Sequence, residues 1–310
     1  MKVYRSLAEF PRLHHLVATV GTFDGVHLGH REIIKRLIKV AHDVNGESLL
    51  ITFDPHPRHV VDPTGDEVRL LTQTEEKIYL LKKTGIDYLL IIPFDQLFAS
   101  LTFDQFITDI LADSLDIKHL IVGYDHAFGK NREGNYNRLL ELGNKLGFTC
   151  EQIDERRVDN EIISSTRIRS YLAEGDIEHA NHLLGHPFFI FGEVVLGNRL
   201  GNKLGFPTIN LGHFAKHKLI PAMGVYASRI DVDGEIYYGM TNVGVRPTLD
   251  ASDLTIETHI FGFDRDIYGK RVVVTFVGRI RNEQKFSGLD ALTAQLAKDK
   301  QTALKMFGFI

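Results

Sequence analysis

The chain has 310 residues, enough for two ordinary domains, and its 44% hydrophobic and 25% charged residues are typical of a soluble globular protein. Its formal net charge of −4, without runs of Lys or Arg, argues against nucleic acid or an anionic membrane surface as the main partner. The N-terminus has no apolar signal segment, no stretch approaches the roughly 20 apolar residues of a membrane span, and Cys150 is the only cysteine. We therefore expect a cytoplasmic protein without a disulfide or a cysteine-based metal cluster.

In the first half of the chain, strand-like apolar runs alternate with helical patterns. The strands are expected at residues 16–20, 48–53, 88–92, 119–122 and 148–153. Apolar residues at helical spacing lie between these runs. Thr72 with Glu75, and Thr102 with Gln105, are expected to form capping boxes at the starts of two helices. Such alternation predicts an α/β, Rossmann-like parallel sheet with helices on both faces, in which ligands bind beyond the carboxyl ends of the strands.

The pattern changes in the second half. Two short helices are expected at 165–173 and 176–184, and Gly185-His-Pro187 then breaks the helical pattern. Further strands are expected at residues 188–196, 224–232, 235–243, 254–261 and 271–280. Asp233-Gly234 is a strong hairpin signal, and one long helix is expected at 289–306. Short strands with one terminal helix predict a small antiparallel β-barrel, and we place the domain boundary so that the domains are 1–184 and 185–310.

The segment Gly21-Thr-Phe-Asp-Gly-Val-His-Leu-Gly-His30 lies where the first strand ends and the first helix begins. Its glycines allow backbone to approach a ligand, the helix N-terminus attracts phosphate, and His27 and His30 can donate hydrogen bonds to phosphate oxygens. The candidate phosphate contacts are Gly21, Phe23, Asp24, Gly25 and Gly29. For one histidine alone a helix cap is the alternative, and a zinc pair would lack a third ligand at useful spacing.

This segment is neither a Walker A loop nor a dinucleotide-binding glycine motif. His27-Leu-Gly-His30 resembles the signature of the HxGH nucleotidyltransferase superfamily. The resemblance implies attack on the α-phosphate of a nucleoside triphosphate, with pyrophosphate as the leaving group. Catalysis of this kind depends on positioning and charge stabilisation and needs no protein nucleophile. His27 and His30 are therefore the candidate catalytic residues.

Three further segments narrow the resemblance. Thr52-Phe-Asp-Pro-His-Pro57 follows the second strand, and Gly123-Tyr-Asp-His-Ala-Phe-Gly129 follows a later one. Ile163-Ser-Ser-Thr-Arg-Ile-Arg169 opens a helix, where hydroxyls can cap the helix or hold phosphate and Arg169 can neutralise it. Each has an ordinary alternative, namely a proline turn, a glycine loop or an N-cap. Together and in this order they resemble the adenylyltransferase module of bacterial bifunctional riboflavin kinase/FMN adenylyltransferases, also called FAD synthetases.

The resemblance assigns roles to individual residues. It implies a catalytic role for Arg169 and ATP phosphate contacts from Ser164, Ser165 and Thr166. It implies FMN contacts from Phe53, Asp54, Pro55, Pro57 and Asp125. His126-Ala127 departs from the family, which more often has an aromatic residue followed by arginine, and this departure leaves the contact from that loop open.

The resemblance continues through the second domain. A glycine-rich segment around Lys203 could form a flap over nucleotide phosphates, but its spacing does not fit a Walker A loop. The segment Pro207-Thr-Ile-Asn210 is similar to the Pro-Thr-Ala-Asn motif of riboflavin kinases, which implies that Thr208 and Asn210 hold Mg²⁺ near ATP. The implied ATP contacts of this module are Gly197, Gly201, Lys203, Gly205 and Pro207. A glycine-rich hairpin followed by a rigid turn is the alternative.

Glu257 lies in the segment Leu254-Thr-Ile-Glu-Thr-His-Ile260. Strand alternation puts Leu254, Ile256 and Ile260 on one face and Glu257 and His259 on the other. A solvated strand carboxylate is the alternative, whereas the kinase-like context makes Glu257 the candidate general base that takes the proton of the ribityl 5′-hydroxyl. The resemblance further implies flavin contacts from Arg246, Arg281 and Glu283.

We therefore expect conversion of riboflavin to FMN with ATP and Mg²⁺ at the second domain. The first domain would transfer AMP from a second ATP to FMN, giving FAD and pyrophosphate. These substrates are the expected partners, and the sequence does not identify a protein partner. Two alternatives stay open: adenylylation or cytidylylation of another small phosphate, and a flavin-binding regulator without catalysis.

Overall fold

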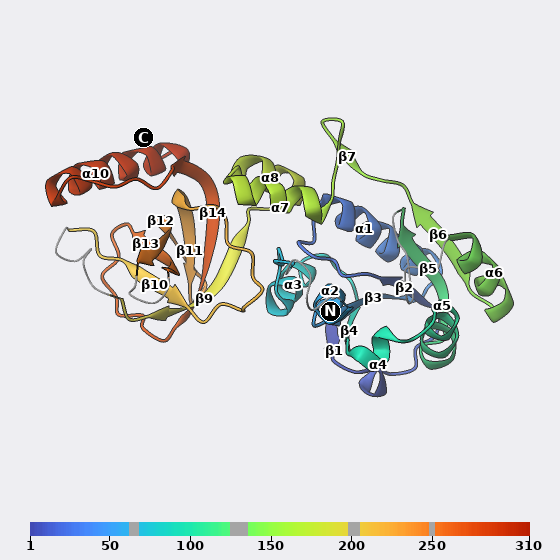
Figure 1. Ribbon diagram of the computed structural model, residues 1–310. Coiled ribbons are helices and arrows are strands. Elements are labelled where there is room, and N and C mark those ends of the chain that lie inside the picture. Colours follow the sequence, from blue (N-terminus) through green and yellow to red (C-terminus); the bar gives the residue numbers. More distant parts are fainter. Residues whose placement is uncertain (62–67, 125–135, 198–204, 248–251) are drawn as a thin grey trace. The chain divides into compact units, whose positions relative to one another are not determined.

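The computed structural model describes residues 1–61, 68–124, 136–197, 205–247 and 252–310, without the side chains of residues 246, 247, 252 and 253. The chain forms two compact units, Met1–Ser164 and Ser165–Ile310 (Figure 1).

The first unit contains a six-stranded sheet in the order β1-β4-β3-β2-β5-β6, and all of its strand pairs are parallel. Its strands are β1 (Lys2–Tyr4), β2 (Leu16–Val20), β3 (Glu47–Asp54), β4 (Tyr88–Pro93), β5 (Ile117–Gly123) and β6 (Thr149–Ile153). Its helices are η1 (Leu7–Glu9), α1 (Leu28–Asp43), α2 (Pro57–Val61), α3 (Thr74–Leu81), α4 (Gln96–Ala99), α5 (Phe103–Gln105), the π-helical η2 (Phe106–Ser114) and α6 (Tyr136–Leu146). A small hairpin of β7 (Arg157–Val158) and β8 (Glu161–Ile162) follows. The predicted parallel sheet is confirmed.

Helices cover both faces of this sheet, as the sequence predicts. Every residue of β2 is buried, which requires packing on both sides of the strand. On one face α1 contributes Ile34 and Leu37, and on the other Phe103 and Leu111 join the core cluster. Figure 1 shows α1 and α5 on opposite sides of the strands. The ends of the strands, rather than the faces, are therefore where a ligand can reach the sheet.

One of the two predicted capping boxes is confirmed and the other is wrong. Thr102 and Gln105 cap α5 reciprocally, through Gln105 N to Thr102 Oγ1 (3.2 Å) and Thr102 N to Gln105 Oε1 (2.9 Å). Before α3 the cap lies one residue later than predicted, because Glu76 accepts the hydrogen bond from the backbone of Gln73. Thr72 instead accepts a hydrogen bond from the backbone of Gly25, in the turn described below.

The second unit contains a closed barrel in the order β10-β13-β12-β11-β14-β9, with all pairs antiparallel. Its strands are β9 (Phe189–Val195), β10 (Ile209–Gly212), β11 (Gly224–Val232), β12 (Glu235–Pro247), β13 (Ser252–Ile260) and β14 (Arg271–Arg281). Its helices are α7 (Ser165–Glu174), α8 (Ile177–Leu184) and α10 (Leu289–Met306). The predicted barrel with a terminal helix is confirmed, and the strand β10 was not predicted.

The helices α7 and α8 pack against the barrel. Asn181 of α8 donates a hydrogen bond to the Phe276 carbonyl (3.0 Å) and accepts one from the Phe188 backbone (2.6 Å). The sequence analysis grouped these helices with the first domain, because their pattern continues the helical half of the chain. In the structure their tertiary contacts place them in the second compact unit, which begins at Ser165, and the domain boundary after residue 184 stays a prediction.

Candidate active sites

The Gly21–His30 segment forms a constrained turn between β2 and α1. Phe23 (φ 47°) and Val26 (φ 41°) adopt the left-handed backbone conformation that non-glycine residues rarely adopt, and Gly25 has φ 86°. A β-branched residue such as Val26 is strained there, so the surrounding structure must hold the turn in place. Strain of this kind gathers at ligand-binding sites.

Asp24 provides part of that support. Its side chain is 2% exposed and accepts hydrogen bonds from the backbone N–H groups of Leu71 (3.1 Å) and Thr72 (2.8 Å). Thr72 Oγ1 in turn accepts a hydrogen bond from the Gly25 backbone (2.9 Å). Asp24 and Thr72 therefore tie the turn to the segment that precedes α3. The sequence analysis assigned Asp24 to ATP binding, and in the structure its carboxylate accepts hydrogen bonds from the backbone of Leu71 and Thr72 and from the Thr72 hydroxyl (3.3 Å).

The two histidines of the motif lie face to face at the N-terminus of α1. Their ring centroids are 3.6 Å apart with an interplanar angle of 14°. His27 Nδ1 caps the helix by accepting a hydrogen bond from the His30 backbone (3.3 Å), so the neutral His27 ring carries its proton on Nε2. A Cβ at Gly29 would lie 3.3 Å from the His27 ring, which explains why a glycine separates the histidines.

The Nδ1 atom of His30 is buried and has no hydrogen-bond partner among the described residues. Burial, and to a smaller extent the positive charges of His27 and Lys77, hold the pKa of His30 well below its usual range. The imidazole is therefore neutral near pH 7 in this structure, and a phosphate group would both satisfy its hydrogen bonding and favour its charged form.

The end of β3 lies beside this turn, as the sequence predicts. Thr52 Oγ1 donates a hydrogen bond to the Thr22 carbonyl (3.2 Å), which joins the two segments directly. Beyond Thr52, the side chains of the predicted FMN-binding residues Asp54 and Pro55 are exposed, and Pro57 opens α2. The strand end and the turn thus form one continuous edge of the sheet.

An aromatic cluster lies at the same edge. Phe53 is half-buried and packs against Phe94 (ring centroids 5.4 Å apart) and Phe98 (5.8 Å). The sequence analysis found Phe53 but missed its two partners. The available signal was their position directly after β4, since parallel strands end at the same edge.

The remaining predicted residues of the adenylyltransferase module are not brought into this edge by the described contacts. Ser164 closes the first unit, and Ser165, Thr166 and Arg169 lie in α7 of the second unit. Asp125, together with His126 and Ala127, lies outside the described residues. Their assigned roles stay predictions.

In the barrel, three polar residues line up across neighbouring strands. Glu257 of β13 pairs in register with Asn210 of β10 and with Asn242 of β12. Residues directly opposite each other in a sheet point to the same face, so the three side chains form one row. Ile256 (1% exposed) and Thr258 (0%) point to the barrel interior, which leaves Glu257 on the outer face as predicted.

The Pro207–Asn210 turn is held beside that row. His259 hydrogen-bonds through Nδ1 to the Pro207 carbonyl (2.8 Å), and the Phe206 ring meets the His259 ring edge-on. A Cβ at Gly197 would overlap the Asn210 side-chain amide, so only glycine leaves room for that amide. The sequence analysis missed Asn242 and the anchoring role of His259, because both depend on strand register.

The predicted flavin contacts of this module differ in their surroundings. Arg281 forms an ion pair with Asp299 of α10 (2.8 Å), whose carboxylate is 1% exposed, so its guanidinium anchors the terminal helix. Glu283 lies over Gly244, where a Cβ would overlap its carboxylate. Gly205 has φ 75°. The side chain of Arg246 and the residues Gly201 and Lys203 lie outside the described part of the chain.

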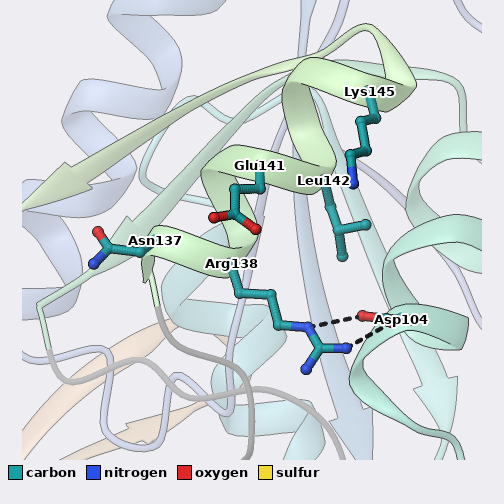
Figure 2. A pocket seen from close by; sticks show the side chains of 6 residues that line it. All are labelled: Asp104, Asn137, Arg138, Glu141, Leu142 and Lys145. Atoms are coloured by element: carbon teal, nitrogen blue, oxygen red, sulfur yellow. Dashed lines mark hydrogen bonds and ion pairs between the residues drawn. The ribbon is translucent and has the colours of Figure 1, made fainter.

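One pocket lies apart from both candidate sites. Figure 2 shows its lining from α5 and α6, where Arg138 faces Asp104 and donates to both carboxylate oxygens (3.1 and 2.7 Å). None of the predicted site residues lines it. Within the described ranges, no three His, Cys, Asp or Glu side chains form a metal-binding group, and no helix has the length and apolar character of a membrane span.

Comparisons with known proteins match both halves of the chain. A family model of FAD synthetase matches residues 10–167, and a family model of riboflavin kinase matches residues 184–307. A curated "Bifunctional riboflavin kinase/FMN adenylyltransferase" from Haemophilus influenzae is 38% identical over 310 residues, covering 99% of both chains. A protein of the same name from Escherichia coli K12 is 39% identical over 312 residues, covering 99% of this chain and 98% of its own.

A solved structure shares the fold along almost the whole chain. It covers 97% of this chain and 98% of its own, with a TM-score of 0.87 and 29% identity. Its title describes a macrolide-efflux protein from Streptococcus pneumoniae, a description that the curated relatives above do not share. Because two family models and the full-length relatives agree, the chain belongs to the bifunctional riboflavin kinase/FMN adenylyltransferase family, as the sequence predicts, and carries both activities.

Proposed function

We propose that the two activities are performed by two separate sets of residues. The stacked His27 and His30 at the N-terminus of α1 carry the adenylyl transfer. The register that places Asn210 and Asn242 beside Glu257 carries the phosphorylation of riboflavin. The single observation behind this division is that His27 and His30 lie in the first compact unit, whereas Asn210, Asn242 and Glu257 lie in the second.

In adenylyl transfer, a phosphate oxygen of FMN attacks the α-phosphorus of ATP. The new bond forms as the bond from that phosphorus to the bridging oxygen breaks, and pyrophosphate leaves with the electron pair. His27 donates from Nε2, since its Nδ1 already caps the helix, and His30 donates to the same phosphate oxygens. Donors fixed before the reaction stabilise the added negative charge without reorganisation.

In the kinase step, the riboflavin 5′-hydroxyl attacks the γ-phosphorus of the other ATP, and ADP leaves. Glu257 takes the hydroxyl proton, which raises the nucleophilicity of the oxygen as the new bond forms. The neighbouring amides of Asn210 and Asn242 flank this carboxylate in the strand register and can orient it or the bound substrate.

The donors beside Glu257 fit Mg²⁺. Thr208 and Asn210 offer hard, neutral oxygens, and Gly197 leaves space for the Asn210 amide. Mg²⁺ commonly takes few protein ligands and completes its coordination with phosphates and water. Thr208 and Asn210 would therefore hold the ion, which when bound neutralises charge on the ATP phosphates.

We also propose that the protein works in the cytoplasm, where ATP and Mg²⁺ are abundant. The single cysteine, Cys150, forms no disulfide, which fits a reducing compartment.

Separable lesions test this assignment. The protein is incubated with ATP, Mg²⁺ and either riboflavin or FMN, and the flavins are separated by chromatography. Glu257→Ala should form no FMN from riboflavin but still convert supplied FMN to FAD. The double variant His27→Ala, His30→Ala should accumulate FMN. If either variant lost both activities while remaining folded, the two-site assignment would be wrong.

A further inference from the structure

A buried lysine, with no ionic partner among the described residues, lies next to the adenylyl-transfer site. Lys77, the fourth residue of α3, is only 6% exposed. Its Nζ donates one hydrogen bond, to Thr52 Oγ1 (3.0 Å), and no described carboxylate lies within the 4.0 Å of an ion pair. An ammonium has three N–H donors, so two of them lack an acceptor in the described structure. Such a group is costly to bury, because desolvation of the charge is not compensated.

The position of this ammonium is informative. Its acceptor, Thr52, ends the buried part of β3 and donates in turn to the Thr22 carbonyl in the phosphate-binding turn. Lys77 therefore lies at the junction of the two segments that the adenylyl-transfer site requires, the His-containing turn and the end of β3. The positive charge of Lys77 also reaches His30, where it contributes to lowering the pKa of that ring.

A purely structural role explains this lysine poorly. Asp24 and Asp54 both favour the charged ammonium, yet burial outweighs them and lowers the pKa of Lys77 to about 8. The carboxylate of Asp24 is also engaged by the backbone of Leu71 and Thr72. The fold thus holds a cation that costs stability, an arrangement typical of functional sites.

We propose that Lys77 binds phosphate at the adenylyl-transfer site, where it supplies positive charge between the attacking FMN phosphate and the α-phosphate of ATP. The reaction brings two anions together, and a fixed cation at that point reduces their repulsion before the new bond forms. Phosphate oxygens would accept the two hydrogen bonds that Lys77 does not make within the protein. This proposal rests on the assignment of the His27–His30 turn to adenylyl transfer.

The variant Lys77→Met tests the proposal, because it keeps an unbranched side chain that is one atom shorter and removes the charge. Removing one preorganised donor to a developing anion typically lowers turnover by about 10²–10³-fold, and we expect a loss of this size in FMN adenylylation. Riboflavin phosphorylation should stay at the wild-type rate, and the midpoint of thermal unfolding should be unchanged or higher. Lys83→Met, at an exposed lysine just after α3, is the matched control and should leave both activities intact.

Binding of FMN and of a non-hydrolysable ATP analogue to Lys77→Met, measured separately by calorimetry, identifies which phosphate depends on the lysine. Loss of affinity for either ligand supports the proposal and identifies the ligand whose phosphate Lys77 binds. Wild-type adenylylation by Lys77→Met would overturn it, as would a lowered unfolding midpoint with loss of both activities, which indicates a structural lysine. If the double histidine variant also kept adenylylation, the site assignment itself would fail, whereas a defect in that variant alone would reject only the role of Lys77.

Discussion

The two candidate sites of this chain are built in different ways. The adenylyl-transfer site centres on one continuous segment, Gly21–His30, at a single junction between a strand and a helix. The kinase site is assembled from β10, β12 and β13, whose polar residues meet only through strand register. The first is therefore visible in the sequence as one motif, whereas the second is visible there only as separate segments, around Asn210 and Glu257, which strand register brings together.

The two sites carry different charged and polar groups, and each set suits the reaction proposed for its site. The first site gathers His27, His30 and Lys77, donors that suit the stabilisation of negative charge. The second places the carboxylate of Glu257 between two neutral amides, which suits the removal of a proton. Under our proposal, one chain uses ATP in two ways, with preorganised donors at one site and a positioned base at the other.

The largest effect is expected from Glu257→Gln. The amide keeps the size of the side chain but cannot accept the hydroxyl proton, so riboflavin phosphorylation should fall by about 10²–10⁴-fold. Adenylylation of supplied FMN should not change. Initial rates with each flavin check this prediction, and an equal loss at both steps would show that the two sites are not independent.

A second prediction concerns the stability of each compact unit against unfolding. Asp299→Ala leaves the Arg281 guanidinium without its buried partner, and removal of one member of a buried ion pair typically costs about 3–5 kcal/mol. Because this pair joins α10 to β14, kinase activity should be lost at lower urea concentration while the midpoint for adenylylation stays in place.

The matched control for this prediction is Glu151→Ala in the first unit. It removes the pair with Arg36, whose side chains are 38% and 39% exposed, and exposed pairs contribute about 0.2–1 kcal/mol. An equal loss of unfolding free energy in both variants would contradict the prediction that the buried pair contributes more than the exposed pair.

The helix cap and the catalytic donor of His27 can be separated. In His27→Asn the amide oxygen can still accept the hydrogen bond from the His30 backbone, but the Nε2 donor is lost. Adenylylation should fall by about 10²–10³-fold without loss of stability. His27→Ala removes the cap as well and should lower the unfolding free energy by about 1 kcal/mol. Wild-type adenylylation by His27→Asn would limit this histidine to capping.

A smaller effect is expected from Gly197→Ala. The added Cβ would overlap the Asn210 amide and force it away from Glu257, and a displacement of about 1 Å in a positioning group can lower turnover up to about 10²-fold. Gly288→Ala is the control, since no atom lies within 4 Å of its added Cβ and its backbone is extended. The rate of riboflavin phosphorylation distinguishes the two variants. Equal rates would contradict the claim that the added Cβ displaces the Asn210 amide.

The sequence predicted the elements with strong periodicity. The strand Leu16–Val20 and the terminal helix Leu289–Met306 match the structure at both ends. The hairpin at Asp233-Gly234 was also predictable, and both residues have positive φ as that turn requires.

The missed features depend on contacts between distant segments. The strand β10 has four residues and follows a proline turn, so its pattern is too short to read alone. Asn242 carries no local signal, since only register places it beside Glu257. Lys77 reads as a surface lysine in a helix, and its burial follows from packing against β3. The cap at Gln73 was displaced because Thr72 serves the phosphate-binding turn.

The central claim, two independent sites in one chain, is tested most directly by mixing two inactive variants. Glu257→Ala and the double variant His27→Ala, His30→Ala are incubated together with riboflavin, ATP and Mg²⁺, and FAD is measured over time. Our account predicts that neither variant alone makes FAD from riboflavin, whereas the mixture does, because FMN made by one chain is adenylylated by the other. Absence of FAD from a mixture of two folded variants would contradict it.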